Sequence, residues 1–528
     1  MRILPVLAVI VGLLCGCSAA YYERSADRQT LPIVKDYQGK VDKERPAETP
    51  EGVITPRPES AEPVSYQDVA PSGQPRLLSL KDSLALAFSN SRDFKFQKES
   101  LYLSALGFTS VLHNYEWNPS ATLSGDISAD ANGDQPLAAA ADARAALALT
   151  RRLLSGGTFS INAAAIETGE VANVAGDSNS SSASARFSQP LLAGSGVAAR
   201  EALVQARRDL LYDARDFELF REQLAIDVLS DYYQLLLQRS FVATAKANVD
   251  FLTFLYERSD ALFNKGMLSL VDVFRAKQEK LQAENRLSDR QAAYNLALDR
   301  FKISLGLPTD ENVDVADEPI EPEIIGVSLE QAVKTALDDR LDLMSARERL
   351  ADYERKVLVA RNALLPELNF FIQTGISSEP GHDLLDFSAA SGGTASAGLT
   401  LVLPVDKKSE RNAYKASLVA LDRQRRSFAL AEDNVKLNVR ETVRNLHRAE
   451  VSLVIQKENV DLAQQRREAA QLLFEKGEYG NRDIIEAETA LQDAKNAYAS
   501  AKVDYLVANV QLRKDIGTLR VDEQGQWH

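Results

Sequence analysis

Few side chains in this sequence could do chemistry. Its only two cysteines, Cys15 and Cys17, lie close together near the start of the chain. A disulfide between them would close a very small loop and would stabilise little. A metal site usually needs three or four ligands and the four histidines are dispersed, so we expect no metal ion and no other cofactor. The glycine-rich stretches at Ser155 and Gly194 lack the surroundings of a nucleophile or a phosphate loop, and we predict that the protein is not an enzyme.

The surroundings of Cys17 predict a covalent modification instead. Arg2 is followed by twelve apolar or small residues, too few to span a bilayer but suited to the core of a signal peptide. This run ends in Leu14-Cys15-Gly16-Cys17, which resembles a bacterial lipobox, where the last cysteine is acylated and becomes the new N-terminus. We predict a lipoprotein signal peptide at 1–16 and a lipid on Cys17. An ordinary signal peptide with a chance cysteine is the alternative.

Composition limits the partners and the organisation of the chain. The net charge is -14 and the sequence pI is about 5.1, and no basic cluster stands out, so we do not expect nucleic acid as a partner. No apolar run after the signal approaches 18 residues, so we expect no transmembrane helix. Residues 17–76 are rich in proline and cannot bury enough surface to fold alone; we expect a tether or strap.

The rest of the chain repeats itself. The stretch from Ser79 matches the stretch from Ser328, and from Arg200 and Arg411 onward the two copies align without a gap at an offset of 211 residues. A gapless match of this length favours duplication over chance. We therefore expect a first repeat at 77–310, a linker at 311–327, a second repeat at 328–520 and a tail at 521–528.

Each repeat predicts long helices and a group of strands. Residues 198–264 contain no proline or glycine, and as one helix they would extend over about 100 Å. Large residues recur every seven positions on this helix and its second copy, which predicts packing along another helix: Leu203, Leu210, Phe217 and Leu224, and Tyr414, Leu421, Phe428 and Val435. Between the helices, at about 119–190 and 366–404, the period changes to two. Such strands suit a membrane β-barrel or a soluble half-buried sheet, and the lipobox favours the barrel.

The order of these elements resembles the outer-membrane efflux protein family, also called the TolC family, in its lipoprotein branch. The resemblance covers roughly residues 77–520. Its most specific motif lies near the C-terminus, where the family shows a glycine, two acidic residues, an alanine and a late glycine. Four prolines also stand at the family's strand–helix junctions. The matching residues are Gly477, Asp483, Glu486, Ala487 and Gly517, with Pro119, Pro190, Pro366 and Pro404.

The resemblance implies a mainly α fold with a membrane β-barrel. Three copies would form a trimeric α-helical periplasmic tunnel and share one outer-membrane barrel, to which each chain usually gives four strands. The implied function is the exit duct of a tripartite efflux system, which passively conducts small molecules pumped by an inner-membrane transporter through a periplasmic adaptor protein. The outlet of a type I protein secretion system and a lipid-anchored coiled-coil scaffold without a pore are the alternatives.

The same resemblance places two turns at the periplasmic end of the tunnel. They contain Lys265-Gly266 and Lys476-Gly477. Asp483 and Glu486 lie three residues apart at a helix start, where Asp483 as N-cap and Glu486 at N3 would form a capping box, as Ser269 and Asp272 would in the first copy. The family implies that they also form an acidic ring at the pore constriction. It pairs the acid at Asp272 with an arginine, but that position is Tyr479 here, so Tyr479 or the nearby Arg482 would have to replace it.

The first repeat is longer than the second between its strand-region prolines. Pro119 and Pro190 are 71 residues apart, whereas Pro366 and Pro404 are 38 apart. The extra residues include two strand-like runs, Ala143–Leu154 and Thr158–Ile166, joined by Ser155-Gly156-Gly157. We therefore predict six strands per chain and eighteen in a trimeric barrel. The rival is an extracellular hairpin on a twelve-stranded barrel, which the adjacent Arg151 and Arg152 favour because one of them would otherwise face lipid, unless it lies at the membrane interface.

Overall fold

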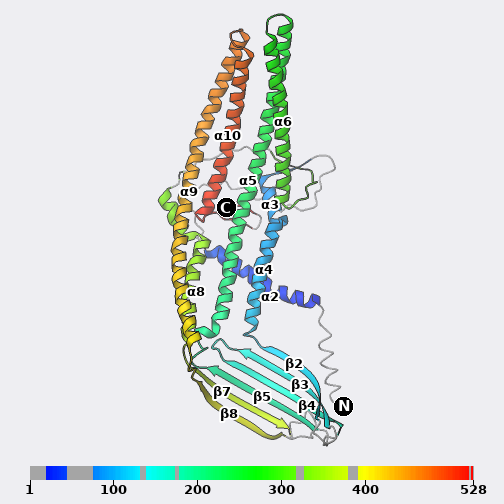
Figure 1. Ribbon diagram of the computed structural model, residues 1–528, viewed down its shortest axis with the longest axis vertical. Coiled ribbons are helices and arrows are strands. Elements are labelled where there is room, and N and C mark those ends of the chain that lie inside the picture. Colours follow the sequence, from blue (N-terminus) through cyan, green and yellow to red (C-terminus); the bar gives the residue numbers. More distant parts are fainter. Residues whose placement is uncertain are drawn as a thin grey trace. The chain divides into compact units, whose positions relative to one another are not determined.

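The computed structural model describes residues 19–44, 75–130, 138–172, 178–316, 326, 328–378, 390–522 and 525–526 (Figure 1). The predicted signal peptide and Cys17 lie outside these residues. The chain divides into two compact units, one of residues 1–40, 101–214 and 345–429, and one of residues 41–100, 215–344 and 430–528. None of the described helices is both long and apolar enough to cross a membrane.

The long helices form where proline and glycine are absent. α5 (Val197–Asn264) and α9 (Lys408–Glu475) each have 68 residues, and α6 (Leu270–Ser304) and α10 (Asn481–Asp515) each have 35. Both pairs of helices begin and end 211 residues apart in the chain. The shorter helices α3 (Leu80–Asn90) and α4 (Arg92–His113) have the same lengths as α7 (Leu329–Asp339) and α8 (Leu341–Asn362). Within the heptad stripes, the buried members are Leu210, Phe217, Leu224, Leu421 and Val435.

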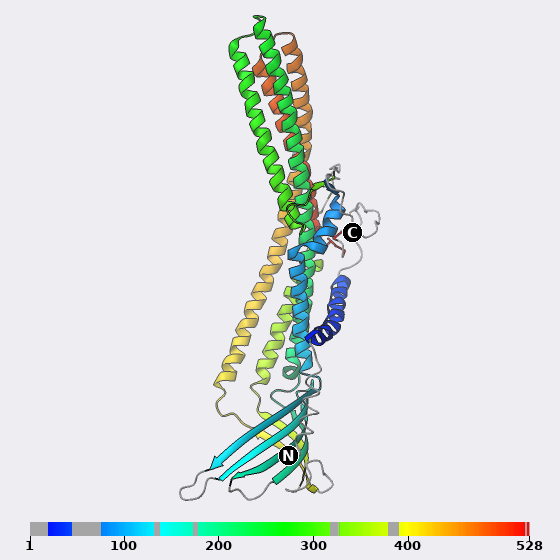
Figure 2. The same cartoon turned by 90° about the vertical axis from the view of Figure 1, so that its right-hand side faces the viewer.

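The first unit contains one antiparallel sheet of six strands, as the alternation pattern predicts. Its order is β2-β3-β4-β5-β7-β8. All six strands start or finish at the edge of the sheet where the chain enters or leaves α4, α5, α8 and α9 (Figures 1 and 2). The sheet is open, because β2 and β8 each have one neighbour among the described strands. The bounds are β2 Asn118–Asp130, β3 Ala138–Arg152, β4 Thr158–Ala172, β5 Ser178–Pro190, β7 Glu367–Ser378 and β8 Ala390–Val402.

The tight β3–β4 turn packs against the beginning of α5. Gly156 has a φ of 96°, in the left-handed region that favours glycine, and a Cβ added there would lie 2.7 Å from the carbonyl oxygen of Gly194. Ser155 Oγ donates to Gln189 Oε1 at 2.8 Å, and Gln189 Nε2 donates back to the carbonyl of Ser155 at 3.1 Å. The predicted Ser-Gly-Gly turn is therefore at the helix-proximal edge of the sheet.

The second unit has its core where a short parallel ladder meets the helices. β1 (Arg76–Leu78) pairs with β6 (Val313–Val315). Around this ladder, α3, α5 and α6 bury a cluster that includes Leu78, Phe88, Tyr232 and Phe301, each 5% exposed or less. At roughly 1.5–3 kcal/mol for each large buried side chain, this cluster is a major source of stability for the unit.

Part of the segment expected to be a tether or strap is helical. α2 (Ala19–Glu44) contains Pro32 and packs on α4. Tyr102 donates to Asp27 Oδ1 at 2.5 Å, and the rings of Tyr37 and Phe108 meet edge to face with centroids 6.4 Å apart. The side chain of Tyr37 is 5% exposed. Its packing on α4 provides the apolar burial that the segment cannot provide for itself.

Candidate functional site

The two turns predicted to form the periplasmic tip connect α5 to α6 and α9 to α10, and they lie at the same end of the second unit (Figure 1). Both turns have a glycine in the left-handed region, with a φ of 72° at Gly266 and 79° at Gly477. These glycines terminate the long helices, because L-residues with a side chain adopt this conformation at a cost. The neighbouring Lys265 and Lys476 are exposed. Each turn thus ends one helix sharply and presents a cation to solvent.

In the first turn, Asp272 has two partners. Ser269 is the N-cap of α6, and its Oγ accepts from the backbone N–H of Asp272 at 3.3 Å and donates to Asp272 Oδ2 at 2.6 Å. The guanidinium of Arg275 donates to Asp272 Oδ1 at 3.1 Å. The predicted cap is present, and Arg275 balances the charge of Asp272 from three residues along the same helix.

In the second turn, the cap differs from the expected one. Gly480 is the N-cap of α10 and Asp483 is at N3, where its Oδ2 accepts from the backbone N–H of Gly480 at 2.9 Å. The expectation that Asp483 is the N-cap and Glu486 is at N3 is therefore wrong. Glu486 lies one turn further and accepts from Arg466 of α9 at 2.9 Å. Because both members of this ion pair are more than half exposed, the pair contributes little to stability.

The equivalent positions of the two turns differ in charge. At the offset of 211 residues, Asp272 corresponds to Asp483, and Arg275 corresponds to Glu486. At these positions the first turn therefore has one acid and one base, whereas the second has two exposed acids, with the exposed Arg482 beside them. The second turn is therefore the more acidic of the two, and the macrodipole stabilises carboxylates near a helix N-terminus.

Asn481 connects the two turns, and it was not predicted. Its side chain is 1% exposed, and its Nδ2 donates to Ser259 Oγ of α5 at 2.8 Å and to the backbone carbonyl of Asp272 at 3.3 Å. Beside it, Leu252, Leu255, Ala283, Phe474 and Ile484 bury an apolar cluster from all four helices. The first residue of α10 is thus hydrogen-bonded to α5 and α6.

Neither predicted replacement for the family arginine contacts Asp272. Tyr479 is 43% exposed and Arg482 is exposed, and in the described part of the chain neither side chain has a hydrogen bond to Asp272. Asp272 is instead paired with Arg275 of its own helix, which does not join the two turns. The i,i+3 spacing of Asp272 and Arg275 can be recognised in the sequence, whereas the contacts of Arg466 and Asn481 join residues that are 20 or more apart in the chain.

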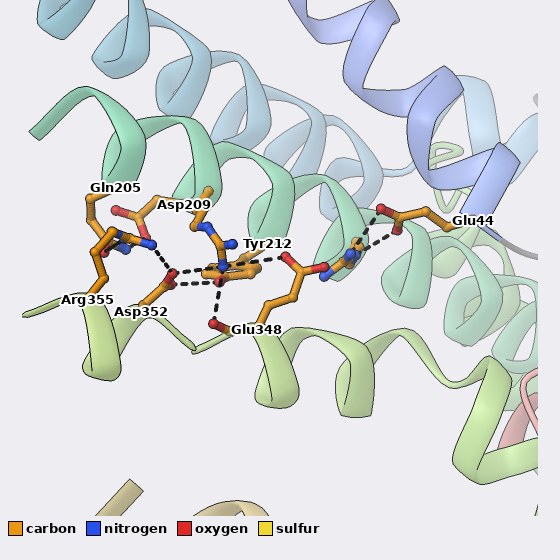
Figure 3. A network of polar contacts seen from close by, with 9 residues as sticks. Glu44, Gln205, Asp209, Tyr212, Glu348, Asp352 and Arg355 are labelled. Atoms are coloured by element: carbon orange, nitrogen blue, oxygen red, sulfur yellow. Dashed lines mark hydrogen bonds and ion pairs between the residues drawn. The ribbon is translucent and has the colours of Figure 1, made fainter. Parts of the chain in front are cut away.

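A buried polar network joins α5 and α8 in the first unit (Figure 3). Asp352 is 2% exposed, and its carboxylate accepts from Tyr212 at 2.7 Å, Arg208 at 2.8 Å and Arg355 at 2.9 Å. Arg355 also donates to Glu201 at 2.6 Å. Burial and the bond to Asp352 raise the pKa of Tyr212 far above its usual value, so its hydroxyl stays a donor. The network fixes these two helices close to the sheet.

Comparisons with known proteins agree with this architecture. Residues 332–518 match the model of the family described as "Outer membrane efflux protein". The chain is 21% identical over 321 residues to outer membrane protein TolC of Escherichia coli (strain K12), and the match covers 57% of this chain. The fold resembles that of the outer-membrane channel OprN (TM-score 0.64, 16% identity, 90% of this chain and 99% of that one). It also resembles the CmeC outer membrane channel of Campylobacter jejuni (TM-score 0.64, 16% identity, 88% and 94%).

The sequence match to TolC spans 63% of that relative's length. The structural matches are more complete, because they cover 90% and 88% of this chain. The two solved structures, OprN and CmeC, are described as outer membrane channels. Residues 332–518 therefore match the outer membrane efflux protein family, and the chain has the fold of the OprN and CmeC channels.

Proposed function

We propose that three copies of this chain form an exit duct through the outer membrane, which passively conducts small molecules delivered by an inner-membrane pump and a periplasmic adaptor protein. The observation that supports this most directly is the six-stranded sheet. Its strands alternate apolar and polar residues and connect without intervening domains to helices of 68 residues. A sheet with one apolar face suits lipid on one side and water on the other.

Exposed apolar side chains support an association of copies. On α9, the second unit exposes Leu430, Leu437 and Val451, which are separated by 7 and 14 residues. On α6 it exposes Phe274 and Leu281 at a spacing of 7 residues, 61% and 56% accessible. Such stripes on long helices are buried by packing against a neighbouring helix, and a homotrimer supplies that neighbour.

The acidic second turn supports a cation-attracting constriction. In a trimer, Asp483 and Glu486 of three chains would bring six carboxylates to one ring. Carboxylates crowded in a narrow pore draw cations and raise one another's pKa. Arg466 would offset part of this charge, and Asn481 would hold the second turn against the first in a closed tip.

The lipid anchor and the energy source complete the proposal. An acylated Cys17 would fix the chain to the outer membrane, with the helices extending into the periplasm. The sequence contains no phosphate-binding loop, so a pump would provide the energy for transport.

Reconstitution of the purified full-length chain in planar lipid bilayers tests the proposal. We expect discrete ion conductance steps from a trimeric species. A lipid-anchored scaffold would give no conductance, which would refute the channel. Restored drug resistance in a bacterium lacking its own efflux channel would support small-molecule efflux. Restored export of a secreted protein without restored resistance would identify the secretion outlet instead.

A further inference from the structure

The β3–β4 hairpin is part of the sheet and not an appendage to it. β2 pairs with β3 along its whole length, from Asn118–Thr150 to Asp130–Ala138. β4 pairs with β5 from Thr158–Ser188 to Thr168–Ser178. The hairpin therefore separates β2 from β5 and continues the hydrogen bonding of both (Figures 1 and 2). An extracellular hairpin resting on a smaller barrel would leave β2 and β5 paired with each other.

The two faces of the sheet also continue through the hairpin. Directly paired residues of an antiparallel sheet share a face. One face is apolar across the strands, with Leu123, Ile127, Ala145, Leu147, Leu149, Ile161, Phe187, Ile372 and Leu399. The other is polar, with Thr122, Ser124, Asp142, Arg144, Ser160, Asn162, Arg186 and Gln373. A barrel wall needs this pattern in every strand.

The arginine pair at the turn does not place a charge against the lipid interior. Arg151 is on the apolar face, at the helix-proximal end of β3, where its Nε donates to the backbone carbonyl of Tyr115 at 3.3 Å. Its guanidinium lies over the ring of Trp117, 5.5 Å from the centroid, and Phe159 meets Trp117 edge to face. Cations among aromatic rings are typical of the membrane–water interface.

The other charge on the apolar face of the hairpin is Glu167, nine residues along β4 from Thr158. At about 3.4 Å per residue and a tilt of about 40°, it lies roughly 23 Å from the turn end. The apolar band of such barrels is about 25 Å tall, so Glu167 and Arg151 lie at its two edges.

We propose that the hairpin makes the shared barrel eighteen-stranded instead of twelve-stranded, which widens its lumen. This rests on the proposed trimer. With strands about 4.8 Å apart and tilted by about 40°, the backbone radius rises from roughly 12 Å to roughly 18 Å. After a side-chain layer of about 5 Å, the open cross-section grows roughly 3–4-fold.

The hairpin can be removed without reversing any strand. Deletion of residues 138–172 leaves β2 and β5 antiparallel, with their apolar residues on the same face. A nitroxide on Thr122→Cys reports the distance between copies, which is about 1.7 times the barrel radius in a three-fold assembly. Pulsed electron resonance should give a distance about 10 Å longer in the parent than in the deletion variant. If the parent and the deletion variant give equal distances, the proposal is wrong. If the parent gives no measurable distance between nitroxides, the trimer itself is refuted.

A second measurement needs no deletion. Ala145 and Ala146 are neighbours on β3 that occupy the apolar and the polar face. In intact outer membranes, a small membrane-impermeant maleimide should modify Ala146→Cys and spare Ala145→Cys, because lipid covers one and water in the lumen reaches the other. Modification of both at similar rates would place the hairpin outside the membrane and overturn the proposal.

Discussion

Replacement of Asn481 by alanine should loosen the contact between the two turns and favour an open duct. Asn481 donates to Ser259 Oγ and to the carbonyl of Asp272, and a separation of α10 from α5 and α6 breaks both bonds. The Ser259 hydroxyl keeps its own bond to Leu255, so the variant loses hydrogen bonds mainly on the side of Asn481. The long helices themselves should be unaffected.

The size of the effect follows from these contacts. Each hydrogen bond contributes about 0.5–1.5 kcal/mol net, and two of them about 1–3 kcal/mol. The buried Oδ1 of Asn481 has no partner in the described part of the chain. Removal of this unsatisfied oxygen is favourable and offsets part of the free energy lost with the two hydrogen bonds. A remainder of about 1–2 kcal/mol shifts the equilibrium between closed and open tips roughly 5–30-fold.

Single-channel recording of the purified protein measures this shift as an increase in open probability. Asn459→Ala is a suitable control, because Asn459 is exposed on α9 and bonds only to the side chain of Gln456 in the described structure. An Asn481→Ala trimer with the open probability of the parent would show that the two turns are held together by other contacts.

Three further perturbations test the remaining chemistry. Cys17→Ser should abolish incorporation of labelled fatty acid, and persistent labelling would rule out Cys17 as the anchor. Asp483→Asn combined with Glu486→Gln should weaken both the cation selectivity of the channel and its block by multivalent cations; unchanged selectivity would leave Asp483 with a capping role alone. Although burial opposes it, the bonds from Arg340 at 2.6 and 3.0 Å lower the pKa of Asp342. A carboxyl whose pKa is lower in the folded than in the unfolded state stabilises the fold at pH values above its unfolded-state pKa. This stabilisation is lost as the pH falls through the folded-state pKa. Asp342→Asn should therefore lower Tm at pH 7, and this deficit should shrink below about pH 4. An equal deficit at both pH values would contradict an electrostatic origin.

The strands were predictable because their side chains alternate, and the limits of that signal are visible in β3. The predicted run began at Ala143, whereas the strand begins at Ala138. Ala138–Ala141 are four identical small residues, which show no contrast between faces and hence no period of two. Backbone pairing with β2 extends the strand through them.

The candidate site was predictable only where its contacts are local. The acidic pair and the glycine turns are sequence motifs, but Gly480 has no side-chain oxygen and was not recognised as an N-cap. The sequence therefore predicts Asp483 as the N-cap, whereas Asp483 is at N3 and its carboxylate accepts a hydrogen bond from the backbone N–H of Gly480. Asn481 and Arg466 act through residues on other helices, and no periodicity reports such contacts.

The helix in the predicted tether illustrates a different limit. Most prolines of residues 17–76 follow Glu44, and Pro32 alone lies within α2. Composition averaged over the whole segment therefore concealed a helix-compatible part. Its order depends on the ring of Tyr37 and the carboxylate of Asp27 finding partners on α4, which is a property of the folded unit.

The pairing of β5 with β7 has a consequence for how the chain folds. The other four ladders of the six-stranded sheet join strands that are neighbours in the chain, whereas Pro190 pairs with Asn369 and Ser182 with Ser377. Closure of a loop of roughly 190 residues costs about 3 kcal/mol more entropy than closure of a five-residue turn. A four-stranded and a two-stranded half-sheet therefore form first and meet last. Until they meet, each presents a bare strand edge and an apolar face to its surroundings, and such edges are where unassembled chains associate wrongly.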